Sequence, residues 1–244
     1  MKNQKLKLFQ TLKQESGILE AYIKQKAHPE KILQILEAGC GQKWPLHLNE
    51  VKHKIHGVDV DEDALKIRKN VAKDLDEIMV GDLRDINLEE NKYDVIYSSF
   101  VLEHIENAEQ VLQNFVKWTA SGGLIIIRVP DRNTVYGFIT RITPYRVHVL
   151  YKKFVEGKAN AGKPGFGPYP TVHDVVISRN GIRSFCEKYN LMIKEEYGHG
   201  YYYKKGKGIF PLLKRLFVYG VYGISLGNLA FRYNNLTYVL EKPF

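Results

Sequence analysis

The chain has 244 residues, 44% of them hydrophobic, and carries 36 Lys and Arg against 27 Asp and Glu, a net charge of +9. This length and apolar content suit one domain with a sizeable core and exclude a disordered chain. The two cysteines, Cys40 and Cys186, give neither a disulfide framework nor a metal-ligand spacing, and we expect no metal site. No apolar run of signal-peptide length follows the basic residues 1–5, so the sequence predicts a cytoplasmic protein.

The first predicted strand, Ile32 to Leu36, is short, apolar and branched, as a buried parallel strand should be, and it leads into Glu37-Ala38-Gly39-Cys40-Gly41. Gly39 and Gly41 allow positive φ and a close approach of the backbone to a ligand. The turn lacks the Gly-Lys-Ser/Thr of a Walker loop, and Trp44 stands where the dinucleotide fingerprint has its third glycine. The carboxylate of Glu37 favours a cationic or hydroxyl-bearing ligand, although an ordinary tight turn would explain the same residues.

Further predicted strands follow in chain order. Residues 54–59 form the second and end at Asp59, 22 residues after Glu37, where doubly wound folds place a carboxylate on ribose hydroxyls. Asp61 is expected to cap a helix. Residues 78–83 form a third strand with Asp82 just past its end, residues 93–99 a fourth, and residues 124–129 a fifth after Gly122 and Gly123. For Asp59 and Asp82 a helix or turn cap is the alternative to a ligand contact.

In order and spacing, residues 30–130 resemble the core of the class I S-adenosylmethionine-dependent methyltransferases, and within them the UbiE/UbiG-like group. The turn at Glu37 to Gly41 resembles the first motif of that family, and Gly81-Asp82-Leu83 resembles its adenine-contacting turn. Residues 98–104 resemble the loop after its fourth strand. The resemblance implies an α/β fold with a doubly wound, Rossmann-like, seven-stranded and mostly parallel sheet. It also implies an antiparallel last strand, with helical and loop insertions over the active site.

The resemblance further implies S-adenosylmethionine as cofactor and S-adenosylhomocysteine as product. The backbone of Gly39 and Gly41 would pass under the methionine portion, and Glu37 would face its ammonium group. Asp59 would accept both ribose hydroxyls. One departure from the family is Gln42-Lys43-Trp44-Pro45 after Gly41, where relatives often carry another glycine and a helix, so the first helix is in doubt.

Four more residues are assigned to the cofactor by the resemblance. Asp82 would take the adenine amino group, and the backbone amide of Leu83 would meet a ring nitrogen. Ser98 and Ser99 would border the sulfonium and the carboxylate. Carboxylates at these strand ends would also favour the positive charge of the cofactor.

Residues 131–178 form an insertion where a plain doubly wound fold needs only a short connection to the helix beginning near Ser178. Its Gly/Pro-rich part predicts a semi-rigid cover, with Phe166 and Tyr169 at its tips, over the carboxyl ends of the strands. We expect the methyl acceptor to bind beneath this cover. His148 and His173 are the candidate catalytic bases, and Asp174 follows His173.

Other polar residues of the same region are assigned less directly. His104 lies in a pattern common to relatives with different substrates, and we interpret it as architectural or on the cofactor side. Four basic residues of the insertion could neutralise an anionic substrate, namely Arg141, Arg146, Lys152 and Lys153.

A second insertion, residues 201–235, separates the sixth predicted strand, residues 191–197, from the last, residues 236–242. Lys214 and Arg215 interrupt its apolar run, which disfavours a membrane span. A helical stripe could instead lie on the inner face of an anionic membrane, or could cover the pocket or contact a second subunit. The stripe consists of Leu212, Leu213, Leu216, Phe217, Val221 and Ile224.

Together these features predict a single-domain S-adenosylmethionine-dependent methyltransferase acting on an oxygen of a small-molecule, glycan or lipid-linked acceptor. The net charge favours anionic partners, and an RNA methyltransferase is one alternative. Nucleic acid is nevertheless disfavoured, because the chain has no zinc knuckle, RRM signature or arginine-rich arm. The other alternative is a module that binds S-adenosylmethionine without catalysis.

Overall fold

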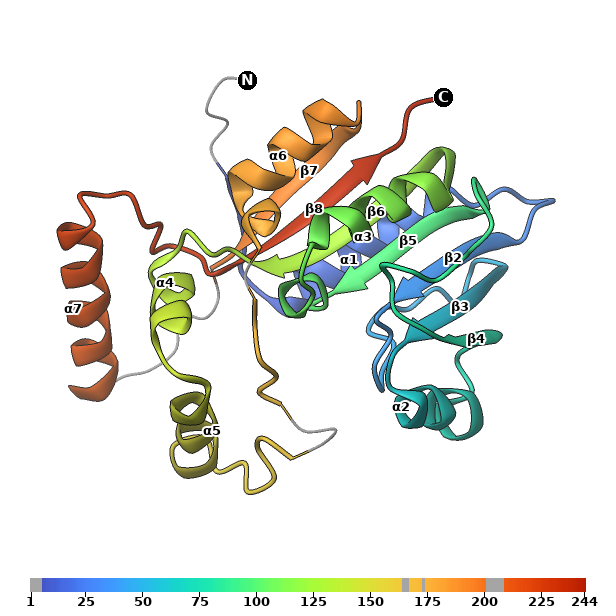
Figure 1. The fold of residues 1–244 in the computed structure, drawn as a ribbon. Coiled ribbons are helices and arrows are strands. Elements are labelled where there is room, and N and C mark those ends of the chain that lie inside the picture. Colours follow the sequence, from blue (N-terminus) through green and yellow to red (C-terminus); the bar gives the residue numbers. More distant parts are fainter. Residues whose placement is uncertain (1–5, 164–166, 173, 201–208) are drawn as a thin grey trace.

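The computed structural model describes residues 6–163, 167–172, 174–200 and 209–244. Within them the chain forms one eight-stranded sheet in the order β1-β7-β8-β6-β5-β2-β3-β4 (Figure 1). The strands are β1 (Lys7–Phe9), β2 (Leu33–Ala38), β3 (His53–Asp59), β4 (Glu77–Val80), β5 (Tyr93–Ser99), β6 (Thr119–Pro130), β7 (Met192–His199) and β8 (Asn235–Glu241).

The sheet is mostly parallel, as predicted. The last strand, β8, runs antiparallel to both of its neighbours, β6 and β7, and the other pairs are parallel. The predicted count of seven strands is wrong by one, because β1 adds an edge strand with Phe9 opposite His199. A strand of three residues is too short to show the alternation by which strands are found in a sequence.

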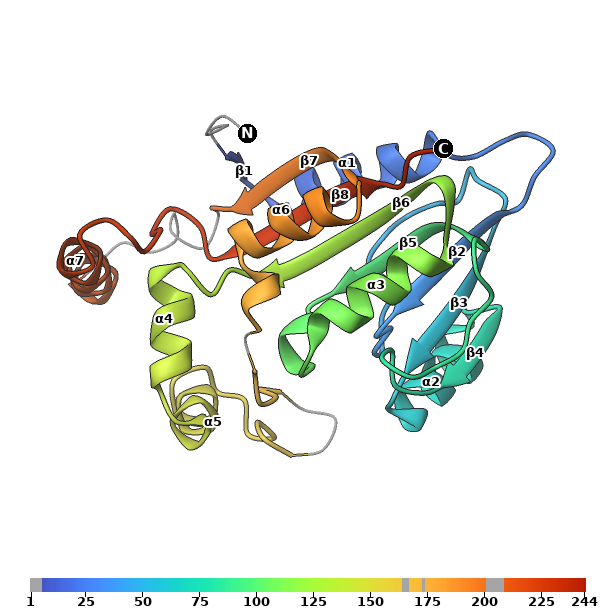
Figure 2. The ribbon, with the colours of Figure 1, turned by 45° about the horizontal axis from the view of Figure 1, so that its top comes forward.

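The helices cover both faces of the sheet (Figure 2). Buried side chains alternate along β6: Leu124 and Ile126 pack toward α1 and α2, whereas Ile125 and Ile127 pack toward α3 and α6. This two-sided burial is typical of a doubly wound sheet. The α-helices are α1 (Leu12–Lys24), α2 (Glu62–Ile67), α3 (Ala108–Trp118), α4 (Val135–Ile142), α5 (Tyr145–Phe154), α6 (Arg179–Lys188) and α7 (Ile209–Ile224).

Local signals in the sequence explain several helix boundaries. Asp61 caps α2 by accepting hydrogen bonds from the amides of Asp63 and Ala64, as predicted. The α2 helix continues into a π-helical turn, Arg68–Ala72. Ser178 caps α6. No helix forms between β2 and β3, where every residue is described. The segment after Gly41, whose sequence departs from the family pattern, is therefore not helical.

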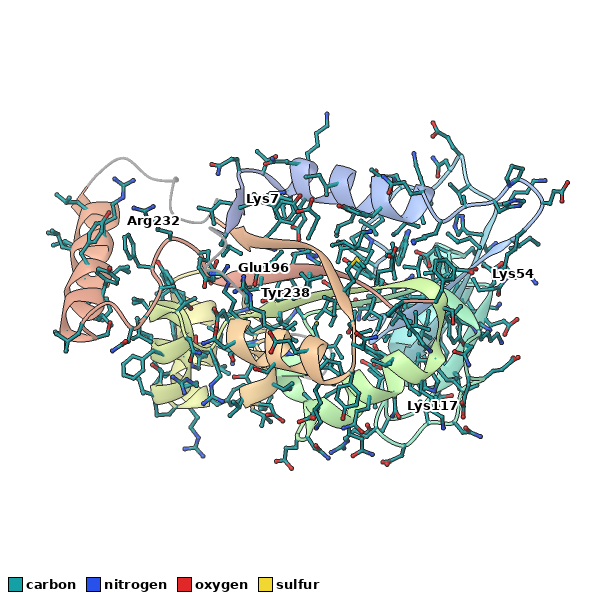
Figure 3. The ribbon with its side chains drawn as sticks, turned by 90° about the horizontal axis from the view of Figure 1, so that it is seen from above. Lys7, Lys54, Lys117, Glu196, Arg232 and Tyr238 are labelled. Atoms are coloured by element: carbon teal, nitrogen blue, oxygen red, sulfur yellow. The ribbon has the colours of Figure 1, made fainter. Side chains whose placement is uncertain are left out.

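Side chains from β7, β8 and α6 meet at one half-buried carboxylate, Glu196. It accepts hydrogen bonds from Arg179 and Arg183, each at 2.7 Å, and from the Tyr238 hydroxyl at 2.8 Å. Figure 3 shows Glu196 and Tyr238 side by side on the sheet. This cluster fixes α6 on the sheet, and the second insertion leaves and rejoins the sheet beside it.

The two insertions gather at one end of the molecule. The α4 and α5 helices follow β6, and α7 lies beside α4, so all three project beyond the sheet on the side opposite to α2 (Figures 1 and 2). Among the described residues, no helix combines the length and the apolar character that crossing a bilayer requires. The cover predicted for the substrate is therefore a separate helical body next to the strand ends.

Candidate functional site

A cleft of 730 Å³ opens at the carboxyl ends of β2, β3, β4 and β5. This is the edge where ligands bind in open α/β sheets, and the volume lies within the range of about 300–1,000 Å³ found for small-molecule sites. Residues from the strand ends form one wall, and residues of the cover form the other. The residues that line the cleft include Gly39, Gly41, Asp59, Asp82, Leu83, Arg84, Ser99, His104, Tyr169 and Pro170.

The glycine turn is held by Asp59. Its Oδ2 accepts a hydrogen bond from the Gly41 amide at 2.8 Å, and its Oδ1 accepts one from the Asp61 amide at 2.9 Å. Gly39 has φ +72°, and a Cβ added there would lie 2.3 Å from a methyl carbon of Val101. Each carboxylate oxygen keeps a second lone pair, so Asp59 can still accept hydroxyl groups of a ligand.

The carboxylate of Glu37 is engaged by a residue that the sequence did not indicate. Arg68 is fully buried and donates to Glu37 at 2.7 Å, to Asp74 at 2.7 Å and to the Cys40 carbonyl at 2.8 Å. Burial raises the pKa of Glu37, while Arg68 opposes that rise. Glu37 lines a smaller hollow of 350 Å³ behind the turn and does not line the main cleft. Its predicted contact with an ammonium group stays a prediction.

Asp82 and Leu83 lie where the sequence predicts them, at the wall of the cleft beyond β4. Arg84 donates a hydrogen bond from Nη2 to Oδ2 of Asp82 at 2.6 Å, and this hydrogen bond lowers the pKa of Asp82. Arg84 also lines the cleft and was not singled out in the sequence. A guanidinium two residues after an acid at a strand end is the signal that could have identified it.

The structure separates the two serines. Ser99 lines the cleft, and its hydroxyl accepts a hydrogen bond from Arg128 at 3.0 Å. Ser98 is buried, lines neither hollow, and its hydroxyl makes no hydrogen bond to any described residue. Successive residues of a strand point to opposite faces, so the sequence could have predicted that only one of the pair reaches a ligand.

The histidine in the cleft is His104. Its Nδ1 lies 2.6 Å from the carbonyl of Pro170, and burial lowers the pKa of the ring. A neutral ring that donates from Nδ1 leaves Nε2 as an acceptor. Glu103 lies below it, with Oε1 3.9 Å from Nε2, and burial raises the pKa of Glu103 to about 8.

Of the two predicted bases, His148 and His173, the structure describes only His148. His148 lies outside the main cleft, and its Nε2 faces the carbonyls of Thr140 and Thr143 at 3.2 and 3.1 Å. His173 lies outside the described residues, as does Phe166. The local pattern around His104 could not show its position, because its hydrogen-bond partner Pro170 is 66 residues away.

His148 lines a second hollow of 570 Å³ between α4, α5 and residues 168–172. Tyr169, Pro170 and Val172 border both this hollow and the main cleft. Basic and hydroxyl side chains line it, and among the described residues no ion pair joins Arg141 or Lys152 to a carboxylate. The polar lining residues include Thr140, Arg141, Thr143, Tyr145, His148, Tyr151, Lys152 and Glu156.

Within the part of the chain that the structure describes, no group of three or more histidine, cysteine, aspartate or glutamate side chains is arranged to hold a metal ion. Both cysteines are buried and unbridged.

Comparison with known proteins identifies the part of the chain that builds this cleft. Residues 36–127 match the methyltransferase domain family. A curated protein of Mycolicibacterium smegmatis, named a probable S-adenosylmethionine-dependent methyltransferase, is 26% identical over 133 residues, 54% of this chain. The match covers 51% of that protein, so this chain aligns with about half the length of its curated relative.

Solved structures share the fold over nearly the whole chain. A SAM-dependent methyltransferase from Archaeoglobus fulgidus superposes with a TM-score of 0.54 at 16% identity and covers 95% of both chains. Phosphoethanolamine N-methyltransferase 2 of Haemonchus contortus, solved with S-adenosyl-L-methionine, gives 0.55 at 14% identity, over 93% of this chain and 53% of its own. At these identities the superpositions establish the fold, and the sequence matches identify the domain.

Proposed function

We propose that this chain is a class I S-adenosylmethionine-dependent methyltransferase, which transfers the methyl group to an oxygen atom of a small-molecule, glycan or lipid-linked acceptor; the matched methyltransferase domain supports the proposal. The observation that carries the proposal is the position of His104. A ring whose Nε2 is free to accept a proton lies in the same cleft as Asp59 and Asp82. A hydroxyl acceptor needs such a group nearby, because its proton must leave as the new bond forms.

The residues of the cleft fit the cofactor. When bound, S-adenosylmethionine supplies an electrophilic methyl group on a positively charged sulfur. Asp59 would accept the ribose hydroxyls, and Asp82 with Leu83 would contact the adenine ring. Gly39 has no room for a side chain, so the turn can lie directly against the methionine portion.

His104 would bind the acceptor hydroxyl and take its proton at Nε2. The Pro170 carbonyl holds the ring in one tautomer, which aims the acceptor nitrogen away from the cover. Glu103 lies next to the same nitrogen and offers the resulting imidazolium a neighbouring carboxyl group. Alignment of the acceptor hydroxyl with the methyl group, and exclusion of water beneath Tyr169, would supply the remaining acceleration of methyl transfer.

The second hollow would receive the rest of the acceptor. Arg141 and Lys152 are both cationic and both lack a carboxylate partner among the described residues, so they suit an anionic group such as a phosphate or a carboxylate. Tyr169 and Pro170 separate this hollow from His104, and an acceptor would lie across them. We therefore propose that the acceptor carries a negative charge at a distance from its methylated oxygen.

The test measures transfer of labelled methyl groups from S-adenosylmethionine into metabolite, glycan, lipid and RNA fractions, together with release of S-adenosylhomocysteine. We expect label in an anionic metabolite, glycan or lipid, with loss of transfer in His104→Gln. Label confined to RNA would replace the proposed acceptor class with nucleic acid. Cofactor binding by calorimetry without transfer into any fraction would indicate a binding module.

A further inference from the structure

The helical end of the molecule leaves apolar stripes in solvent. On α5 the stripe follows the spacing i, i+3, i+7 and i+8 at Val147, Leu150, Phe154 and Val155, which are 47–80% exposed. A stripe with this spacing normally faces the core of a protein. None of the residues of α5 is buried, so its apolar face lacks a partner within the described chain.

The α7 helix repeats this arrangement. Val218 faces inward and is buried, whereas the opposite side presents large apolar side chains that are 49–85% exposed. A Cβ added at Gly220 or Gly223 would meet nothing within 4 Å, so the space on that side is open. The exposed apolar side chains of α7 are Leu212, Leu213, Leu216, Phe217 and Ile224. Of the predicted stripe, only Val221 turns away from this exposed side and is half-buried.

We infer that α5 and α7 form a docking surface for an anionic lipid bilayer. Exposed apolar patches of this kind mark interaction sites, and two helices with apolar stripes flanked by basic residues suit the headgroup boundary of a membrane. The residues of the two apolar stripes line neither the main cleft nor the second hollow, so this inference does not depend on the proposed acceptor.

The distribution of charge selects this partner. The two insertions, residues 131–178 and 201–235, hold 13 of the 36 basic residues but 3 of the 27 acidic ones. The rest of the chain therefore holds 23 basic and 24 acidic residues and is close to neutral. The net positive charge of the protein therefore lies in the segments that carry the exposed apolar stripes, which complements an anionic surface and opposes pairing with a second copy.

Basic side chains border the apolar stripes directly. Arg146 and Lys153 flank the stripe of α5, and Arg215 borders that of α7. Arg232 lies on the connection from α7 to β8 (Figure 3). Each basic residue near an anionic membrane adds an attraction that salt screens, while burial of the apolar stripe supplies the part that salt does not screen. Binding should therefore weaken with salt without vanishing.

The experiment is sedimentation of the full chain with vesicles of phosphatidylcholine alone or with added phosphatidylglycerol. We expect binding to the anionic vesicles. Binding should fall about tenfold or more in Leu216→Glu/Phe217→Glu and in Leu150→Glu/Phe154→Glu, because each double substitution places two acids in a stripe that the membrane would bury. The matched control is Val71→Glu/Met192→Glu, which adds the same charge at two exposed apolar positions on other elements. It should bind as the wild type does.

Two further measurements keep the result decisive. Calorimetry with S-adenosylmethionine shows that each variant is folded, and sedimentation velocity gives the oligomeric state. Absence of binding to anionic vesicles at low salt, or equal binding by all variants, would overturn the inference. A wild-type dimer that the α7 variant dissociates would assign the surface to a second copy.

Discussion

The two halves of this molecule, the region around the cleft and the helical cover, differ in how their charged side chains are paired. Around the cofactor cleft, charged side chains are paired: the fully buried Arg68 with Glu37 and Asp74, and the half-buried Arg84 with Asp82. In the helical cover, Arg141 and Lys152 have no carboxylate partner among the described residues. A buried pair such as Arg68 and Glu37 contributes to the structure, whereas unpaired charges beside a hollow are available to a ligand. The following predictions test that distinction, from the largest expected effect to the smallest.

Arg68→Met should lower the free energy of unfolding by about 3–5 kcal/mol, because it leaves the Glu37 carboxylate buried without its partner. Chemical denaturation measures the loss. The double variant Glu37→Gln/Arg68→Met removes both charges and should recover part of the stability. A single variant as stable as the wild type would mean that the pair is not structural.

His104→Gln should reduce kcat by about 100-fold or more while cofactor affinity stays unchanged, since the base takes part only in the reaction step. Steady-state kinetics with the acceptor found by the labelling assay measures this effect. His148→Gln is the matched control, and we expect it to change KM more than kcat. The opposite result would restore His148 as the base.

Asp59→Ala should weaken S-adenosylmethionine binding by about 1–3 kcal/mol, the scale for charge-assisted hydrogen bonds to a buried ligand. Calorimetry measures this loss directly. Asp63→Ala removes the same charge at an exposed position of α2 and should bind the cofactor normally. Equal affinities in the two variants would remove Asp59 from the ribose site.

Arg141→Gln should raise KM for the acceptor by about tenfold, the effect of losing one charge-assisted contact, with little change in unfolding free energy. Lys66→Gln, a basic residue on α2 away from both hollows, is the control. A loss of stability without a change in KM would mean that Arg141 stabilises the fold and does not bind the acceptor, which would contradict the distinction between the two halves.

The pH dependence of kcat should reflect the depressed pKa of His104. Burial lowers this pKa below its ordinary value of 6.5, so the unprotonated base persists to lower pH than for an exposed histidine. We therefore expect kcat to rise with pH, with a midpoint below 6.5, and then to level off. A pH–rate profile of the wild type should show this limb, and His104→Gln should lack it.

The sequence predicted the core of the fold well because each strand of the core is a short apolar run with an acid or glycine at its end. Asp59 and Asp82 reach the cleft for that reason. The edge strand β1 and the pair of Arg68 with Glu37 could not be predicted, because they join segments far apart in the chain. The separation of Ser98 from Ser99 needed only strand alternation. The UbiE/UbiG-like grouping stays a prediction.

The hydrogen bond from the Gly41 amide to Asp59 has a consequence for the thermodynamics of cofactor binding. Without ligand the turn is already fixed in the shape that would lie against the methionine portion. Little backbone entropy then remains to be lost on binding, so more of the contact energy appears as affinity. A preorganised turn also predicts association in a single kinetic phase, without a slow rearrangement after the encounter.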